Sequence, residues 1–349
     1  MENIKFSICI PNYNYGSYIG ETIKSVLNQK YENYEIIVVD NASTDDSLSV
    51  INSFNDSRIK VFENVYNIGF SPNLDRATER AEGDYIILLS SDDLMKDNAL
   101  HEYNSIINLN KIHHPNIVIF AASDVIDGDN AIFGKKNAKT TDVENYINEK
   151  NISPLNSNNE EFEIYAGLDL LRGVLTANFQ PLGQFLTTCY SKELYNKIEG
   201  YNNTMRIFPD AHFSHKLAFQ NPKLIYTKKN LFSYRIHYSN QNKSSADTQY
   251  LLDNFQFTIS YPKKDLQLIN LDEIVLKRTF VKNCCLKMAF RYLSTGYPAR
   301  AFKYFIFGFS TYPDLMLKNI LTYIFFPIFI FCPIFYLGRI TYKNIFKSN

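Results

Sequence analysis

Two acidic sites follow short apolar segments in the first hundred residues of this chain. Asp40 comes directly after residues 35–39, and the adjacent Asp92 and Asp93 come shortly after residues 85–89. A carboxylate at the end of a buried strand can accept hydrogen bonds from a nucleobase or a ribose. Two adjacent carboxylates are hard oxygen ligands that suit Mg²⁺ or Mn²⁺. Together these residues indicate a site for a nucleotide whose phosphates a divalent cation neutralises.

The segments that carry these acids alternate between strand and helix patterns. Apolar runs with the length of strands buried on both faces occur at residues 6–10, 35–39, 59–62, 85–89 and 117–121. Helical patterns lie between them at residues 18–27, 47–54 and 73–81, and Gly83 is the expected C-terminal cap of the last. This alternation predicts an α/β fold with a doubly wound, mostly parallel sheet. Ligands of such sheets bind outside the carboxyl ends of the strands, where Asp40 and Asp92 fall.

Glycine-rich phosphate motifs do not follow the first predicted strand. Neither G-x-G-x-x-G nor G-x-x-x-x-G-K-[ST] occurs there, which argues against a dinucleotide cofactor and a P-loop. A nucleotidyltransferase also combines a parallel sheet, a metal and a nucleotide, so it stays open as an alternative. It would need a basic, glycine-rich loop for a triphosphate, and residues 11–16 contain no basic residue.

The middle of the chain begins with a polar stretch at residues 127–163. It is rich in Asn, Lys, Glu and Thr, and we expect a flexible loop or a lid, or else a surface insertion without a role. Regular patterns then return. They predict a helix at 168–175, a strand at 185–190, a helix capped by Ser191, a helix after Asp210, and strands near Leu224 and Phe232.

Charge divides this chain into two unequal parts. The 36 basic and 36 acidic residues cancel, which excludes a globally basic nucleic-acid binder. Residues 261–349 contain 13 basic and 4 acidic residues (13 − 4 = +9), so residues 1–260 contain 23 and 32 (23 − 32 = −9). An acidic body with a basic, aromatic tail indicates attachment to an anionic surface. The five cysteines contain no C-x-x-C pair, which is typical of reduced thiols in a cytosolic compartment.

The tail contains a segment that suits a membrane. Residues 320–338 carry no charge and have about the length of a bilayer span, although Pro327 and Pro333 interrupt them. Residues 299–317 mix Phe and Tyr with basic residues, as interfacial helices do. We expect a monotopic or re-entrant insertion in preference to a full span. The alternative is that these aromatic residues cover the rest of the protein or a dimer interface.

Four motifs carry a resemblance to a known family. They are SICIPNYN at residues 7–14, VVDNASTD at 38–45, NIG at 67–69 and LLSSDD at 88–93. Their order and spacing resemble the nucleotide-sugar-binding half of family 2 glycosyltransferases, which have the GT-A fold. A weaker resemblance continues through Gly200-Tyr201, Pro209-Asp210, and Tyr234 to His237 with Ser239. It therefore covers about the first 240 residues.

The resemblance assigns roles to residues by position. Asp92 and Asp93 would hold the divalent cation, Asp210 would be the catalytic base, and Arg235 and His237 are possible contacts to phosphate or acceptor. Nucleotide binding would fall to Pro11, Tyr13, Asp40, Ser43, Asn67 and Asp92. The implied reaction is inverting: the base takes a proton from an acceptor hydroxyl, whose oxygen attacks the anomeric carbon of the donor.

Partners and domains also follow from the resemblance. The donor would be a nucleotide sugar, with UDP as the family's usual nucleotide and dTDP or GDP as alternatives. The acceptor would be a saccharide or a lipid-linked saccharide in surface polysaccharide or glycolipid assembly, on the cytoplasmic side of the cell membrane. Residues 1–125 would form the nucleotide-sugar-binding half, 126–260 the acceptor half with the catalytic base, and 261–349 the membrane-associating tail.

This chain departs from the family at two positions. Ser90 stands where the metal motif often begins with Asp, and Pro209 stands where Glu often precedes the base. These departures keep open a non-catalytic member that binds a nucleotide sugar or scaffolds a membrane complex. Asp210 could instead cap a helix, and His212 is a weaker candidate for the base. Arg235 and His237 could equally be satisfied residues at a strand end.

Overall fold

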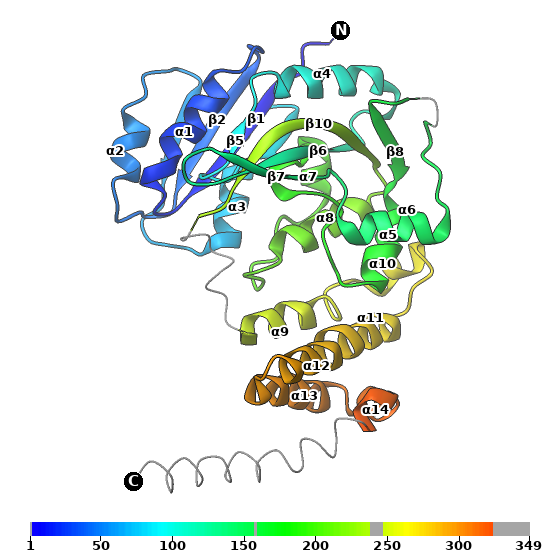
Figure 1. The fold of residues 1–349 in the computed structure, drawn as a ribbon. Helices are drawn as coiled ribbons and strands as arrows, with labels where there is room; N and C mark the ends of the chain where they lie inside the picture. The colour runs from blue at the N-terminus through cyan, green and yellow to red at the C-terminus, as the bar shows by residue number, and fades with distance from the viewer. Residues whose placement is uncertain (1, 157–158, 238–246, 324–349) are drawn as a thin grey trace, which may run out of the picture. The chain divides into compact units, whose positions relative to one another are not determined.

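The computed structural model describes residues 2–156, 159–237 and 247–323 and divides the chain into two compact units (Figure 1). The N-terminal unit comprises residues 1–174 and 179–245. The C-terminal unit comprises residues 175–178 and the chain from 246 onward. Its helices after residue 246 begin at Asp247, within a stretch for which the sequence pattern predicts no element.

A single mixed sheet forms the centre of the N-terminal unit and confirms the predicted α/β fold. Its described strands run in the order β3-β2-β1-β4-β9-β6-β10-β5, with β7 beside β6 and β8 beside β10. The first four are parallel to one another, as are β6 and β10, whereas β9 is antiparallel to both of its neighbours. The strands are β1 (Phe6–Asn12), β2 (Tyr34–Asp40), β3 (Ile59–Glu63), β4 (Tyr85–Leu88), β5 (Leu94–Met95), β6 (Ile117–Ile126), β7 (Ile132–Lys136), β8 (Phe162–Ala166), β9 (Cys189–Ser191) and β10 (Lys223–Arg235).

The helices of this unit lie close to the predicted positions. Ser191 caps α7, because its hydroxyl accepts the Leu194 N–H at 3.0 Å. The segment predicted as a strand at 185–190 is instead a 3₁₀ turn (Phe185–Thr187) followed by the short β9. The helices are α1 (Gly16–Leu27), α2 (Ser47–Asn52), α3 (Phe70–Glu79), α4 (Ala99–Leu109), α5 (Thr141–Lys150), α6 (Gly167–Thr176), α7 (Lys192–Lys197) and α8 (Pro209–Phe219).

Gly83 does not cap a helix, because α3 already ends at Glu79. Its role is close packing of the backbone. The Gly83 N–H donates to the Ser7 hydroxyl at 2.8 Å, and a Cβ at this position would lie 2.7 Å from the Lys5 carbonyl oxygen. The glycine therefore lets the chain pass close to β1 before it enters β4.

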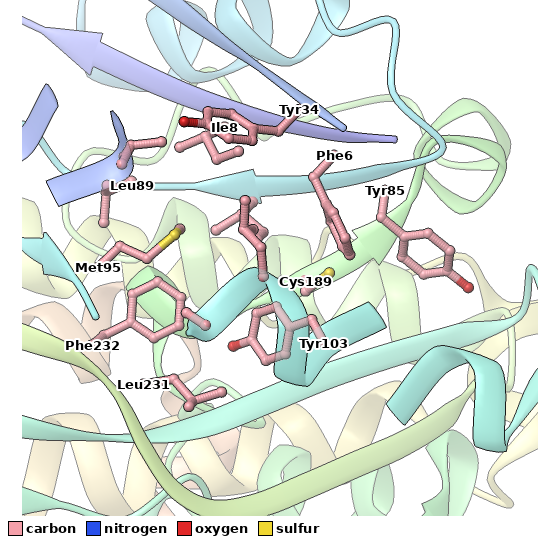
Figure 2. Packing of buried hydrophobic residues seen from close by; sticks show 14 of the residues in the cluster. Phe6, Ile8, Tyr34, Tyr85, Leu89, Met95, Tyr103, Cys189, Leu231 and Phe232 are labelled. Carbon is pink, nitrogen blue, oxygen red and sulfur yellow. The ribbon is translucent and has the colours of Figure 1, made fainter. Parts of the chain in front are cut away.

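The two faces of the sheet explain why its strands read as continuous apolar runs. Phe6 and alternate residues along β1 join a core with Tyr85, Tyr103 and Phe232, which Figure 2 shows from close by. Cys9 points to the opposite face, where its thiol contacts the Ala77 carbonyl oxygen of α3 at 3.3 Å. Because helices cover both faces, no polar alternation is needed along the inner strands.

The polar stretch at 127–163 contains a strand and a helix, so the prediction of one continuous flexible loop is corrected. Strand β7 pairs with β6 as an antiparallel hairpin, in which Asp127 accepts the Asp129 and Ala131 N–H groups at 2.9 Å. Helix α5 buries only Val143 and Ile147, which lie four residues apart on one face. Two apolar residues and one β-hairpin are too few to stand out in an otherwise polar sequence.

The C-terminal unit is helical, as the pattern from residue 271 onward predicts. Tyr312 packs against the rings of Phe255 and Phe280, with centroids 6.1 Å away in each case. The helices are α9 (Asp247–Gln256), α10 (Lys263–Leu268), α11 (Glu273–Thr279), a π-helical segment (Phe280–Leu286), α12 (Lys287–Ser294), α13 (Pro298–Thr311) and α14 (Pro313–Leu317). Among the described residues, no helix is both long and apolar enough to cross a membrane. Most of the uncharged segment at 320–338 lies outside the described residues.

Candidate functional site

The pairing of β5 with β10 brings distant polar residues together beside the acid pair. These strands are antiparallel, and Ser233 pairs with Leu94. Continuing the register by two residues places Arg235 level with Asp92. Three hydrogen bonds confirm this placement. The Arg235 N–H donates to Asp93 Oδ1 at 2.8 Å, Arg235 Nε donates to the Asp92 carbonyl at 2.7 Å, and His237 Nε2 lies 3.0 Å from Asp92 Oδ2.

The two acids of the pair have different surroundings. Asp92 is 7% exposed and has His237 beside its carboxylate. Burial raises the pKa of Asp92, and the imidazole of His237 acts in the opposite direction. Asp93 is 1% exposed and accepts a backbone N–H, and burial together with neighbouring Asp92 raises its pKa well above the usual range. Asp92 is therefore the acid with a ligand-like position, and Asp93 anchors the end of β10.

Arg235 lies inside the protein and binds protein groups along its whole guanidinium. Besides the Asp92 carbonyl, it donates to the carbonyl oxygens of Asp127 and Gly128 at 3.4 and 3.2 Å. Its Nη2 makes an ion pair with Glu21 of α1 at 2.8 Å. The residue has no exposed surface, and in this structure it joins the acid loop, the β6–β7 hairpin and α1.

Divalent-metal chemistry fits only part of the predicted acid pair. Asp92 offers a carboxylate oxygen, which Mn²⁺ and Mg²⁺ both accept, and the neighbouring His237 offers an imidazole nitrogen, which suits transition metals better than Mg²⁺. Within the described ranges, no group of three or more His, Cys, Asp and Glu side chains forms a metal site. A cation bound by few protein ligands takes its others from water and substrate phosphates. The arrangement therefore fits a metal that arrives with a diphosphate. The role of Asp93 as a second ligand stays a prediction.

Asp40 organises the loop at the end of β2. Its Oδ1 accepts from Asn12 Nδ2 at 2.7 Å and from the Ser43 hydroxyl at 2.6 Å, and its Oδ2 accepts the Ser43 N–H at 2.8 Å. Asp40 is fully buried, and Ala42 between it and Ser43 has a left-handed φ of 59°. A non-glycine residue in that region is strained and marks a loop fixed by its surroundings.

The other predicted nucleotide residues lie around this loop. Pro11 is buried in β1, and its carbonyl accepts the Ser91 hydroxyl at 3.3 Å, which joins the ends of β1 and β4. Tyr13 follows β1 and is partly exposed, and Asn67 is exposed between β3 and α3. The strand order β3-β2-β1-β4 places these chain segments at one edge of the sheet. No described contact tests their roles as nucleotide ligands, which stay predictions.

Sequence reasoning missed Asn41, which ties two of these segments together. Its Oδ1 accepts from Asn64 Nδ2 and the Ile68 N–H, both at 2.9 Å, and its Nδ2 donates to Asn67 Oδ1 at 3.0 Å. All four hydrogen bonds of the amide, including one to the Gly69 carbonyl, stay within the loops. The concentration of asparagines after the second and third strands was the available signal.

The first helix also supplies residues that were assigned only to packing. Tyr18 lies 4.4 Å from the His237 ring between centroids, and the Arg235 guanidinium lies 5.1 Å above the Tyr18 ring. Tyr15 contacts the same imidazole edge-on at 5.7 Å. These rings fix the orientation of the histidine beside Asp92. The sequence showed Tyr18 as part of an apolar stripe, and no pattern distinguished it from core.

Asp210 is the second residue of α8 and lines a small cavity. The capping position belongs to Phe208, so Asp210 is not the N-cap. The cavity is lined also by Leu88, the last residue of β4, and by Tyr201 and Ser214 among others. Burial raises the pKa of Asp210 to about 6, against two backbone N–H groups that lower it. A carboxylate with such a pKa is suited to general base catalysis near neutral pH.

His212 is the weaker candidate for the base. It is buried, and desolvation lowers the pKa of its imidazole to about 3. An imidazole with that pKa binds a proton too weakly to draw one from a hydroxyl group at neutral pH. The comparison favours Asp210.

The strand order, the acid pair after β4 and the carboxylate in a cavity beside the same strand define the class of protein. It is an α/β domain whose acid pair lies at the carboxyl ends of parallel strands, where sheets of this kind bind their ligands. The family model described as "Glycosyl transferase family 2" matches residues 7–159. The match confirms the predicted resemblance to family 2 glycosyltransferases over residues 7–159.

Individual relatives agree with this assignment. Glycosyltransferase GlyG of Streptococcus pneumoniae is 25% identical over 277 residues, which are 79% of this chain and 85% of GlyG. The Escherichia coli glucosyltransferase WfgD is 35% identical over 135 residues, which are 39% of this chain and only 51% of WfgD. Crystalline S. aureus TarS in complex with UDP-GlcNAc superposes with a TM-score of 0.58 at 18% identity, over 80% of this chain and 71% of that one. The superposition shows the shared GT-A fold.

Removing the Arg235 guanidinium should destabilise the N-terminal unit strongly. Arg235→Met leaves buried carbonyl groups without their donor, so we expect a loss of about 3 kcal/mol in the free energy of unfolding. Lys197→Met is the matched control, because exposed Lys197 pairs only with exposed Glu193 among the described ion pairs and should contribute less than about 1 kcal/mol. Urea unfolding of both variants and the wild type measures the difference. Equal stabilities of the two variants would contradict the proposed anchoring role.

Proposed function

We propose that this chain transfers a sugar from a nucleoside-diphosphate sugar to an acceptor hydroxyl with inversion of the anomeric centre. The observation that carries the proposal is Asp92, which faces His237 at 3.0 Å after β4 and can receive a metal-bound diphosphate. UDP is the favoured nucleotide. WfgD is named as a UDP-Glc-dependent enzyme, and TarS was crystallised with UDP and with UDP-GlcNAc.

Proton transfer in this proposal belongs to Asp210. Its carboxylate removes the proton from the acceptor hydroxyl as the oxygen attacks the anomeric carbon from the side opposite the leaving group. The bond between the sugar and the diphosphate breaks in the same displacement, so the centre inverts and no covalent enzyme intermediate is needed. Partial burial of the carboxylate beside Leu88 keeps its pKa raised.

Asp92 and His237 would hold the divalent cation, Mn²⁺ or Mg²⁺. When bound, such an ion neutralises the charge that develops on the departing diphosphate. The chain's own residues prepare this position: Tyr18 orients the imidazole, and Arg235 fixes the backbone of the acid loop. Asp40, Ser43, Pro11, Tyr13 and Asn67 would contact the base and the ribose.

Asp210→Asn tests the base. Asn keeps the size and loses the basic oxygen, so transfer should fall by roughly 10² to 10⁴-fold while donor binding stays unchanged. In the wild type, kcat/KM should rise with pH through about 6, because the carboxyl is protonated below its raised pKa and cannot accept a proton. The measurement is the initial rate of nucleotide release by both proteins as a function of pH between pH 5 and pH 8.

Two results would contradict this assignment. Unchanged transfer by Asp210→Asn would remove Asp210 from the mechanism. Wild-type protein that binds a nucleotide sugar but transfers to no acceptor would favour a non-catalytic member, which Ser90 and Pro209 keep open.

Asp92→Ala tests the metal site. We expect the Mn²⁺-dependent part of UDP affinity to fall about tenfold or more, since an oxygen ligand to the ion is lost. Asp93→Asn is the matched control. Its side chain still accepts the Arg235 N–H, so Mn²⁺-dependent binding should persist. Calorimetric titration of UDP with and without Mn²⁺ gives both numbers. Intact metal dependence in Asp92→Ala would overturn the ligand assignment.

The acceptor is proposed to be a saccharide attached to a lipid, in surface polysaccharide or glycolipid assembly. Support comes from the name of WfgD, whose acceptor is a diphosphoundecaprenol-linked sugar, and from the teichuronic acid assignment of Bacillus subtilis TuaG. The basic, aromatic composition after residue 261 supports a position at the cytoplasmic face of a membrane. There the chain would meet both a cytosolic donor and a membrane-borne acceptor.

Vesicle binding of the full chain tests the membrane proposal. We expect co-sedimentation with vesicles containing phosphatidylglycerol and much weaker binding to pure phosphatidylcholine, because the basic residues gain about 1 kcal/mol each near an anionic surface. A variant with Arg339, Lys343 and Lys347 changed to Gln should lose most of the preference for anionic lipid. Absence of wild-type binding to both vesicles would overturn the proposal.

A further inference from the structure

We propose that Lys136, at the end of β7, contacts the diphosphate of the nucleotide-sugar donor. The inference rests on the proposed donor site and adds to it a residue from outside the four sequence motifs. It starts from a single contact: Lys136 Nζ lies 3.4 Å from the centroid of the Tyr234 ring. Tyr234 immediately precedes Arg235, so the ammonium group lies over the strand end that holds the acid pair.

Strand register explains how a residue of the hairpin reaches this position. Gly134 pairs with Val125 of β6, and Val125 pairs with Tyr234 of β10. Continuing the β5–β10 register places Tyr234 level with Asp93. Lys136 is two residues from Gly134 and shares its face of β7. The lysine side chain extends over the Tyr234 ring, which is level with the acids.

Lys136 interacts electrostatically with the acid pair. Burial lowers the pKa of Lys136, and the Asp93 carboxylate raises it again. The interaction is mutual, because Lys136 lowers the pKa of Asp93. The ammonium group therefore already stands within electrostatic reach of the place where the donor's phosphates would bind.

The neighbouring arginine is engaged elsewhere. Every described contact of the Arg235 guanidinium is to a protein group: three carbonyl oxygens, the Glu21 carboxylate and the Tyr18 ring. Redirecting it to a phosphate would break buried hydrogen bonds. Lys136 would give up its contact with the Tyr234 ring, which is a weak interaction, and no described hydrogen bond of its ammonium group. An ammonium–phosphate contact is stronger than that.

The backbone beneath Lys136 is held in place, so only its side chain has to move. Gln184 Nε2 donates to the Lys136 carbonyl at 3.2 Å and to the Asn137 carbonyl at 2.8 Å. Its Oε1 accepts the Ser123 hydroxyl at 2.7 Å. A flexible four-carbon stem on a fixed strand end suits a residue that follows a phosphate from donor to leaving group.

The test compares nucleotide binding by three variants of the full chain. Lys136→Met removes the charge and keeps the stem, Lys136→Arg keeps the charge, and Lys135→Met removes a charge from the other face of the same strand. Each is titrated calorimetrically with UDP, dTDP, GDP and CDP in the presence of Mn²⁺, and with the monophosphate of whichever base the wild type prefers. Thermal unfolding confirms that the variants are folded.

We expect Lys136→Met to bind the preferred diphosphate about tenfold more weakly than wild type, and the corresponding monophosphate with nearly unchanged affinity. Lys136→Arg should recover most of the loss, and Lys135→Met should match the wild type. Equal diphosphate affinity in folded Lys136→Met would overturn the inference while leaving the donor site intact. If the wild type binds none of the four diphosphates, the donor-site proposal and this inference both fall.

Discussion

The hydrogen bonds of one buried guanidinium, that of Arg235, connect the segments of the candidate site. Arg235 ends β10, and its donors join three separate segments: the acid loop after β4, the β6–β7 hairpin and helix α1. A buried cation is costly unless its hydrogen bonds are satisfied. If one of these segments moved away, the buried guanidinium would lose hydrogen-bond acceptors that compensate its charge. The position of Asp92 therefore depends on a residue 143 positions later in the chain. It is the long-range pairing of β5 with β10 that makes this possible.

Much of the N-terminal fold could be predicted because its strands are buried on both faces. Strands β1 to β4 and helix α1 lie where the apolar runs and the helical stripe indicate. The stretch at 127–163 could not be predicted in the same way. Strand β7 obtains its stability from backbone pairing with β6, and α5 from two side chains, so neither leaves a strong periodic signal.

The positions of the acidic residues in the candidate site could be predicted from the sequence, but the differences between them could not. Asp40, Asp92 and Asp210 stand at strand ends or a helix start, as sequence position indicates. Their differences come from partners that no single-sequence pattern contains. Asp92 faces an imidazole, whereas adjacent Asp93 faces a backbone N–H. Tyr18 of α1, which packs against His237, looks like a core residue in sequence, because it belongs to the apolar stripe of the helix.

The acid pair and Asp210 need different pKa values. A metal ligand must be ionised, whereas a general base needs a pKa close to the working pH. Burial raises the pKa at both places, and different neighbouring groups lower it. At the acid pair, His237, Arg235 and Lys136 favour the ionised forms, and a divalent cation would do so more strongly. At Asp210, two backbone N–H groups are the opposing contributions among the described residues, and burial still raises its pKa to about 6. If nearby positive charge cancelled the effect of burial on Asp210, its pKa would fall and it would be a weak base. If burial were unopposed at Asp92, the carboxyl group would stay protonated and bind no metal. The fold can therefore support metal binding at Asp92 and proton abstraction by Asp210. Basic side chains act on the acid pair, and none of those described is among the groups that shift the pKa of Asp210.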